Sequence, residues 1–510
     1  MAENKRIAKN TVFMAVRMAI TMGISLYTSR VVLAQLGFVD FGIYNVVGAV
    51  ALFMGFFNSA LAYAMQRFMN VELGQTGGRD MQRVFSACCV CTLIVTGVFI
   101  AVAEAGGMWF LNNHLSIPAE RMHDARIVFQ LSLLIVACEL LRVPYNSLII
   151  AHERMAFFAY NSIVEAVLKL AVVVLLMIAG GNKLLIYVGS LVGVAVIITG
   201  AYVVYCRRHF PTLRFSLARG RGKVREIGKF AGWNLLTCIS DLAFLQGSPI
   251  ILNIFFGVTL NATMGIANQV KTAVYAITRG MQVASNPQII QSYAAGNNVD
   301  FTGLVDRISR LSFYIVLFLG LPIILNAGFI LSLWLTDVPP DCGVFVRLMV
   351  LFCIVDSLTA PLWAAMQATG NIARYQIVMS AGWLMSLPLI WGGYRLGFPS
   401  YWLLAVWCMI DFVLLWIRLF FNERSCGIKV SLYVRRVLLP IARVVVAGGL
   451  LPVMAACLDL APLWRFLLTG TVSCLSLGGA IYFLGIDSAE RDAVRKGVAK
   501  LTGMLKSKKR

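Results

Sequence analysis

Fifteen charged side chains interrupt the long apolar stretches of this 510-residue sequence. Nine are basic, namely Arg17, Arg30, Arg142, Lys169, Lys271, Arg279, Arg347, Arg418 and Arg443. Six are acidic, namely Glu104, Glu139, Glu165, Asp241, Asp356 and Asp411. If these stretches cross a bilayer, each charge facing its centre costs about 2.5–3.5 kcal/mol on insertion scales. The charged side chains must therefore pair, reach the headgroups or line water.

Three stretches carry their polar residues on one helical face, at spacings of mostly three and four. The stripes are Asn10, Arg17, Thr21, Ser25 and Thr28; Asn234, Thr237, Asp241 and Ser248; and Asn268, Lys271, Tyr275, Arg279 and Gln282. A polar stripe on an apolar helix indicates a watery surface inside a bundle.

The charge balance of these residues predicts the ligand. Lys271 lies about thirteen residues, or about 20 Å, inside its stretch and has no local partner, which leaves a cavity role or a long-range ion pair. By contrast, Glu165 and Lys169 are four apart, and Glu139 and Arg142 three apart, so a structural pairing explains them. The nine bases exceed the six acids by three. A cationic chamber favours an anion, and phosphate or pyrophosphate suits Arg and Lys.

The elements that position these residues are membrane spans. The sequence is 59% hydrophobic and 13% charged, with a mean hydropathy of +0.81. A span needs about 20 mostly apolar residues. Fourteen such runs occur, at 11–34, 41–65, 84–105, 125–149, 156–179, 184–206, 227–254, 258–285, 308–333, 344–368, 375–394, 400–421, 437–457 and 464–485. We therefore expect an all-α polytopic membrane protein.

The basic residues fix its orientation. The net charge is +21, but the basic residues lie in short segments between spans, which argues against a nucleic-acid partner. About thirty lie on the side of the N-terminus, against five opposite: Arg121, Arg126, Lys183, Arg395 and Arg465. Both termini are expected to be cytoplasmic, and the first span is expected to be retained because no cleavage site follows it.

An internal repeat predicts two lobes. G-I-Y-N-V-V at 42–47 matches G-I-A-N-Q-V at 265–270, and Pro144 and Pro361 each lie seven residues before an alanine and a short turn. Both matches link a span to the sixth one after it. We expect an N-terminal six-helix lobe (1–206), a basic cytoplasmic linker (207–229), a C-terminal six-helix lobe (230–421), an appended hairpin (437–485) and a basic tail (486–510) that reads as a surface helix or a solubilising segment. In transporters built from parallel repeats, the substrate site lies between the two lobes. Pro144 and Pro361 would interrupt or kink their helices, either as hinges or as fixed architectural kinks.

Motifs for catalysis or cofactors are missing. The sequence has no G-x-x-x-x-G-K-[ST] loop and no H-E-x-x-H. Its 12 cysteines lie mostly inside apolar runs, and no CxxC pair among them suggests a metal site. Loops are short, which disfavours a membrane glycosyltransferase or polymerase. We expect a carrier that is not an enzyme and uses no metal or cofactor.

Five segments resemble one family: 30–47, R-V-P-Y-N-S-L-I-I-A-H-E-R-M-A-F at 142–157, 265–270, N-P-Q-I-I-Q-S-Y at 286–293 and M-Q-A-T-G at 366–370. They are similar to Wzx-type polysaccharide-export flippases of the multidrug/oligosaccharidyl-lipid/polysaccharide (MOP) superfamily, over about residues 5–430. The resemblance implies a MATE-like pair of lobes in the bacterial inner membrane. It implies ion-driven transfer of an undecaprenyl-pyrophosphate-linked oligosaccharide for O-antigen, lipopolysaccharide or capsule, with polymerase or assembly proteins as partners beside membrane lipids.

The resemblance also assigns roles to residues. It matches the cationic lumen to Arg17, Lys271 and Arg279, and less closely to Arg142. Asn268 and Tyr275 share the stripe of Lys271 and join the expected substrate site. Asp241, Glu139 and Glu165 are the candidates for a coupling ion. A cation-coupled multidrug exporter of the same superfamily and a peptidoglycan-precursor flippase stay as alternatives.

Overall fold

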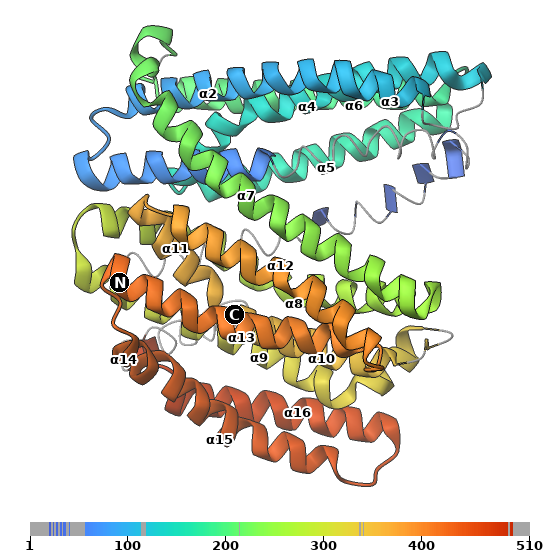
Figure 1. Ribbon diagram of the computed structural model, residues 1–510, viewed down its shortest axis with the longest axis vertical. Coiled ribbons are helices and arrows are strands. Elements are labelled where there is room, and N and C mark those ends of the chain that lie inside the picture. Colours follow the sequence, from blue (N-terminus) through green and yellow to red (C-terminus); the bar gives the residue numbers. More distant parts are fainter. Residues whose placement is uncertain are drawn as a thin grey trace, which may run out of the picture.

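Helices make up almost all of the chain that the computed structural model describes. These residues are 57–113, 119–213, 215–335, 338–339, 341–487 and 490–492, with scattered positions between 20 and 40. No strand occurs among them (Figure 1). Eleven of the described helical segments are long and apolar enough to cross a membrane. The prediction of an all-α polytopic membrane protein is confirmed.

The helices follow one another with short connections. A helix at 57–76 comes first. It is followed by α2 (Met81–Val102), α3 (Met108–Asn113), α4 (Met122–Ala151), α5 (Met155–Ile178), α6 (Lys183–His209), α7 (Leu217–Phe256), α8 (Val258–Ala294), α9 (Asn298–Trp334), α10 (Cys342–Asp356), α11 (Thr359–Thr369), α12 (Ala373–Arg395), α13 (Trp402–Cys426), α14 (Val430–Tyr433), α15 (Leu439–Ala456) and α16 (Pro462–Ala480). Single π-helical turns follow α2, α14 and α16.

Every predicted span from the third to the fourteenth coincides with helix. The eighth, α8, is as long as its neighbours but is not among the eleven most apolar segments, because it carries the polar stripe around Lys271. Most of the first predicted span, 11–34, and most of the second, 41–65, lie outside the described residues.

Two separate hydrophobic cores divide the helices. One core is built from buried residues between Val32 and Ala231, joined by Ile372, and the other from buried residues between Phe244 and Ala480. We call the helices from 57 to 209 the N-terminal lobe and α8–α13 the C-terminal lobe. α7 belongs to both, because its first half packs on α2 and its second half on α12, and Figure 1 shows it running obliquely from one lobe to the other.

The appended pair α15–α16 lies against α9, on the far side of the C-terminal lobe (Figure 1). Gly448 lets the two helices approach closely, since a Cβ there would stand 2.9 Å from Leu477 Cδ2. Asn326, at a non-helical kink in α9, donates a hydrogen bond to Thr469 Oγ1 of α16 at 2.8 Å. The pair is thus fixed to the lobe by a polar contact as well as by apolar packing.

The tenth predicted span is broken, and Pro361 explains the break. α10 ends at Asp356 and α11 begins at Thr359, so the helix is interrupted at Ser357 and Leu358. A proline ring clashes with the carbonyl four residues earlier, here that of Ser357, and removes a backbone donor. Pro144, its counterpart in the repeat, lies within a continuous α4. The break exposes the Asp356 end of α10 to the interior of the lobe.

The two lobes touch at the basic end of the bundle. Arg67 donates to the carbonyls of Gln367, at 2.8 Å from Nε, and Ala368, at 3.4 Å from Nη2, at the end of α11. Gln291 of α8 donates to Asn70 Oδ1 at 3.0 Å and to the Ala151 carbonyl at 2.8 Å. These contacts hold the N-terminal lobe against α8 and α11 on the side predicted to be cytoplasmic.

The connection and the tail are also partly ordered by helix and by ion pairs. α7 begins at Leu217, so helix covers the later part of the predicted linker. Arg310 of α9 pairs with Asp487 at 2.7 Å and with Glu490 at 3.4 Å, which fixes the start of the tail against the C-terminal lobe. The tail beyond residue 492, including its predicted amphipathic face, lies outside the described residues.

Candidate functional site

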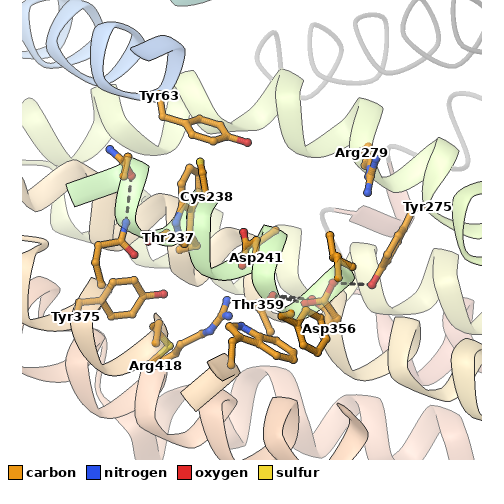
Figure 2. A pocket seen from close by; sticks show the side chains of 18 of the residues that line it. Tyr63, Thr237, Cys238, Asp241, Tyr275, Arg279, Asp356, Thr359, Tyr375 and Arg418 are labelled. Carbon is orange, nitrogen blue, oxygen red and sulfur yellow. Dashed lines mark hydrogen bonds between the residues drawn. The ribbon is translucent and has the colours of Figure 1, made fainter. Parts of the chain in front are cut away.

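A cavity of about 390 Å³ lies inside the C-terminal lobe and is covered by Tyr63 of the N-terminal lobe (Figure 2). Five helices of this lobe and α7 contribute its walls. Its polar and charged lining residues are Tyr63, Asn234, Thr237, Asp241, Lys271, Tyr275, Arg279, Asp356, Thr359, Tyr375, Gln376 and Arg418. Most of the described lining comes from the C-terminal lobe, and the expected position of the site between the halves stays a prediction.

Three cations line this cavity. Lys271, Tyr275 and Arg279 follow at intervals of four along α8, so they share one helical face. The Lys271 ammonium stands 5.4 Å from the Trp407 ring centroid, and the Arg279 guanidinium 5.5 Å from the Tyr275 ring. Among the described residues, neither cation has a carboxylate within 4.0 Å.

The third cation, Arg418, enters from α13. Its residue is only 8% exposed, and its Nε has no hydrogen-bond partner among the described residues. Figure 2 shows its guanidinium pointing toward Asp241 from the opposite wall. A buried guanidinium with an unused donor is available for an anionic or hydroxyl-bearing ligand.

Two aspartates face these cations. Asp356 accepts hydrogen bonds from Tyr275 Oη at 2.5 Å and from Thr359 Oγ1 at 2.9 Å (Figure 2), and Thr359 reaches it because the helix is interrupted between α10 and α11. Asp241 lies on α7. Among the described residues, three cations and two carboxylates thus line the cavity, a formal surplus of one positive charge. Asp411, fully buried behind the wall, adds a third carboxylate near Arg418.

Amides close one end of the cavity. Asn234 Oδ1 accepts from Gln367 Nε2 at 2.9 Å and from Gln376 Nε2 at 3.0 Å, so it joins α7, α11 and α12. Nearby, the Tyr375 hydroxyl is buried and makes no hydrogen bond within the described part of the chain. These groups can exchange hydrogen bonds with hydroxyls of a ligand.

Aromatic rings form the remaining walls. Phe244 packs on Trp383 and Trp407 with centroid distances of 4.5 and 4.3 Å. Tyr63 meets Trp363 edge to face at 4.7 Å, across the lobe boundary. Charged groups, amides and aromatic faces thus converge on one space.

Four of the predicted site residues lie in this cavity: Lys271, Arg279, Tyr275 and Asp241. Asn268, one turn before Lys271, does not line it; its carbonyl accepts a hydrogen bond from Thr272 at 2.9 Å. Arg17 lies outside the described residues.

Arg142, Glu165 and Glu139 lie apart from the cavity, in the N-terminal lobe. Arg142 Nη1 is 3.1 Å from Glu165 Oε2, and Lys169 Nζ is 2.8 Å from Glu165 Oε1. The expected Glu165–Lys169 pair is confirmed, whereas Arg142 pairs with Glu165 on α5 instead of with Glu139 on its own helix. Glu139, half-buried on α4, stands near this network. These residues form a second group of intramembrane charges.

Sequence reasoning missed Asp356 and Arg418. The predicted span 400–421 ends three residues after Arg418, which leads one to expect this side chain to reach the headgroups. However, α13 continues to Cys426, which leaves Arg418 about 12 Å inside the helix. One available signal was the seven-residue spacing from Asp411 to Arg418, which places both on one face of an apolar helix. For Asp356 the signal was Pro361, which predicts a helix break beside it.

Beyond this geometry, the fold is similar to that of solved MATE transporters. No protein-family model matches the chain, and no curated protein matches it in sequence.

Three solved structures illustrate the likeness. A multidrug resistance MATE family transporter in an outward-facing conformation aligns with a TM-score of 0.68 and 14% identity, over 84% of this chain and 97% of that one. A MATE in complex with MaD5 aligns with a TM-score of 0.72 and 13% identity, over 84% of this chain and 97% of that one. A MOP superfamily transporter from Pyrococcus furiosus aligns with a TM-score of 0.67 and 13% identity, over 82% of this chain and 96% of that one. At these identities the likeness establishes the fold.

Proposed function

We propose that the chain is a flippase for an undecaprenyl-pyrophosphate-linked oligosaccharide, the repeat unit of an O-antigen, capsule or exopolysaccharide. It would move this cargo across the bacterial inner membrane by ion-coupled alternating access, with both termini in the cytoplasm. The observation that carries the proposal is the cluster of Lys271, Arg279 and Arg418 in one cavity lined by aromatic rings and amides.

The charge of the cavity supports an anionic headgroup. A pyrophosphate offers several oxygens to the guanidinium of Arg418 and the ammonium of Lys271, through charge-assisted hydrogen bonds of about 1.5–3 kcal/mol each. The MOP transporter from Pyrococcus furiosus is described as having a binding pocket of reverse polarity that suggests a different function. Pocket polarity can therefore vary on this fold while the fold is kept.

The neutral lining supports a sugar. Aromatic faces such as Trp363 and Trp383 can cover the apolar face of a pyranose, while Asn234 and Gln376 supply amides for its hydroxyls. A cavity of about 390 Å³ takes the pyrophosphate and the first sugar, and the polyprenyl tail stays in the bilayer.

Coupling is assigned to the acids. Asp241 and Asp356 share the cavity with the cations, so a proton or metal cation on these carboxylates and the cargo on the cations would affect each other electrostatically. Glu139 and Glu165 are the corresponding acids of the N-terminal lobe. A polymerase or other assembly protein would take up the delivered repeat unit outside.

A cation-coupled drug exporter is the second candidate, favoured by the same two aspartates and by the multidrug MATE neighbours. It differs in the group that must bind the cargo, since a cationic drug needs Asp241 and is repelled by Lys271. A peptidoglycan-precursor flippase would use the same pyrophosphate site and differ in the sugar.

The test is surface-polysaccharide export in cells that depend on the protein. Lys271→Ala should reduce export at least tenfold, because one charge-assisted bond is lost, while Lys271→Arg should retain most of it. Lys183→Ala is the control, because this lysine is the first residue of α6, does not line the charged cavity and donates a hydrogen bond to Gln35 Oε1 at 2.9 Å. Protein abundance in the membrane is measured for each variant.

Reconstitution then identifies the cargo. Purified protein in vesicles is given labelled lipid-linked oligosaccharide, lipid-linked peptidoglycan precursor or a cationic dye, with and without an ion gradient. Full transfer of the oligosaccharide by Lys271→Ala overturns the proposal, and so does dye efflux that needs Asp241 but not Lys271.

A further inference from the structure

A second cavity of about 570 Å³ lies within the N-terminal lobe, away from the charged one. It is bounded by α2, α4, α6 and the segment that leads from α6 to α7. Its lining residues are Phe85, Tyr145, Leu148, Cys206, Arg207, Phe210, Pro211, Leu213 and Phe215. It shares no lining residue with the first cavity, so the function proposed above leaves it unexplained.

The cavity lies at the level of the headgroups. Phe85 is four residues from the start of α2, Tyr145 six from the end of α4 and Cys206 three from the end of α6. At 1.5 Å per residue these positions are about 6, 9 and 4.5 Å inside the helix ends. All three ends belong to the side that carries most of the basic residues, so the cavity opens where phosphates and glycerol backbones of that leaflet lie.

Its described lining combines one cation and one hydroxyl with apolar surface. Arg207, Pro211 and Phe215 are exposed at the rim, whereas Phe85, Leu148 and Cys206 are buried at the bottom. The Tyr145 hydroxyl and the Arg207 guanidinium are close enough to interact electrostatically. A hydroxyl and a guanidinium can both donate hydrogen bonds to a phosphate, and the other described lining side chains are hydrocarbon or thiol.

His152, in the turn after α4, supports the rim without adding charge. Its ring packs on Phe210 at 4.5 Å, and its Nδ1 lies 3.0 Å from the Leu148 carbonyl. Burial lowers the pKa of His152, and the nearby Arg154 lowers it further, so the ring is neutral at pH 7. Among the described lining residues, Arg207 is therefore the cation.

We propose that this cavity binds an anionic glycerophospholipid of the cytoplasmic leaflet, with its phosphate on Arg207 and Tyr145 and the upper part of an acyl chain against Phe85, Leu148 and Leu213. Basic pockets between spans on the cytoplasmic side are a known mode of recognising acidic lipids. The depth and the apolar wall favour a lipid over a soluble phosphate. The lipid-linked sugar is disfavoured because the described lining residues include no amide and no further hydroxyl for a sugar.

The bound lipid would brace the connection between the lobes. Phe210–Phe215 precede α7, and the Ser216 N–H donates to Ser86 Oγ of α2 at 3.1 Å. The cavity thus lies between α2 and the segment that begins the lobe-crossing helix. Occupancy should stabilise the N-terminal lobe against heat.

The experiment uses full-length protein in neutral lipid nanodiscs or mild detergent, with phosphatidylglycerol as the probe. Native mass spectrometry counts bound lipid, and thermal melting measures stabilisation. Arg207→Ala should weaken binding at least about tenfold, the loss expected for one charge-assisted contact. Arg208→Ala is the matched control, because this neighbouring arginine is exposed and does not line the cavity.

A second variant keeps the charge and removes the space. Leu213→Trp should fill the cavity and also abolish the phosphatidylglycerol-dependent stabilisation, with Arg207 in place. Equal losses in Arg207→Ala and Arg208→Ala overturn the proposal in favour of a diffuse basic surface. Competition by soluble glycerol phosphate as strong as by the lipid, or a lipid-linked sugar displacing phosphatidylglycerol at equal concentration, also overturns it.

Discussion

Replacing Arg67 with alanine tests what holds the two lobes together at the basic end of the bundle. Arg67 lies on the helix at 57–76, one turn beyond Tyr63, and reaches two carbonyls at the end of α11. Its guanidinium also lies 4.8 and 4.9 Å from the rings of Phe68 and Phe230, which belong to the N-terminal core. Those ring contacts persist when the lobes separate, so only the hydrogen bonds to the two carbonyls contribute to the free energy that holds the lobes together.

The magnitude follows from these two hydrogen bonds. A hydrogen bond from a charged donor contributes about 1.5–3 kcal/mol, and the second bond, at 3.4 Å, belongs at the low end or below. Together they favour the closed arrangement by about 3 kcal/mol, which corresponds to a change of about 10²-fold in the open population. Arg67→Lys keeps the charge near the rings but loses the planar pair of donors, so an intermediate effect is expected.

Labelling of Cys238 reads out the opening, because this thiol lines the charged cavity and is 9% exposed. An impermeant maleimide is applied to inside-out vesicles, and peptide mass spectrometry follows the modification of Cys238. Arg67→Ala should speed labelling by up to about 10²-fold. Arg83→Ala is the control, since Arg83 is exposed on α2 and lies beside Gly222 of α7. Equal labelling rates in wild type, Arg67→Ala and Arg83→Ala would refute the reasoning.

Gly370→Ala should open the predicted cytoplasmic side as Arg67→Ala does, because Gly370 has φ +79° and an added Cβ would overlap the Arg67 guanidinium. The labelling rate of Cys238 measures this opening, and a rate equal to that of the wild type would contradict the prediction. Arg310→Ala should loosen the start of the tail, because Asp487 loses its ion pair and Glu490 keeps only the pair with Arg307. Faster limited proteolysis there would reveal the loosening, with unchanged cleavage elsewhere as the control. Asn326→Ala should lower the unfolding free energy by about 1 kcal/mol, the usual size of an interhelical hydrogen bond in a membrane, and a thermal melt identical to wild type would count against that contact.

The sequence was most informative about the helices. Runs of about 20 apolar residues predicted every described span because the bilayer core sets one length for all of them. The break after Asp356 was also foreseeable from Pro361, yet its repeat partner Pro144 sits in an unbroken helix. A proline removes one backbone donor in either case, and whether a helix breaks there depends on which neighbouring helices can accommodate the bend.

The site was only partly predictable. The stripe of α8 led directly to Lys271, Tyr275 and Arg279, because residues four apart share a face whatever the fold does around them. Which face meets which helix depends on tertiary packing. For that reason Arg142 was expected beside the cargo but pairs with Glu165 in the other lobe, and Arg418 was expected near the headgroups but enters the cavity.

Arg418 decides the polarity of the cavity. With Asp241 and Asp356 ionised, Lys271 and Arg279 alone would leave the lining formally neutral, and Arg418 supplies the surplus positive charge. Burying an isolated ion costs several kcal/mol, and the carboxylates around Arg418 offset this cost. These acids therefore stabilise the buried arginine and also compete with a ligand anion for its guanidinium. A ligand anion that replaces a carboxylate at Arg418 would release that carboxylate to bind a proton or a metal cation. In the proposed flippase, the same residues would therefore provide both the binding of an anionic headgroup and its coupling to an ion.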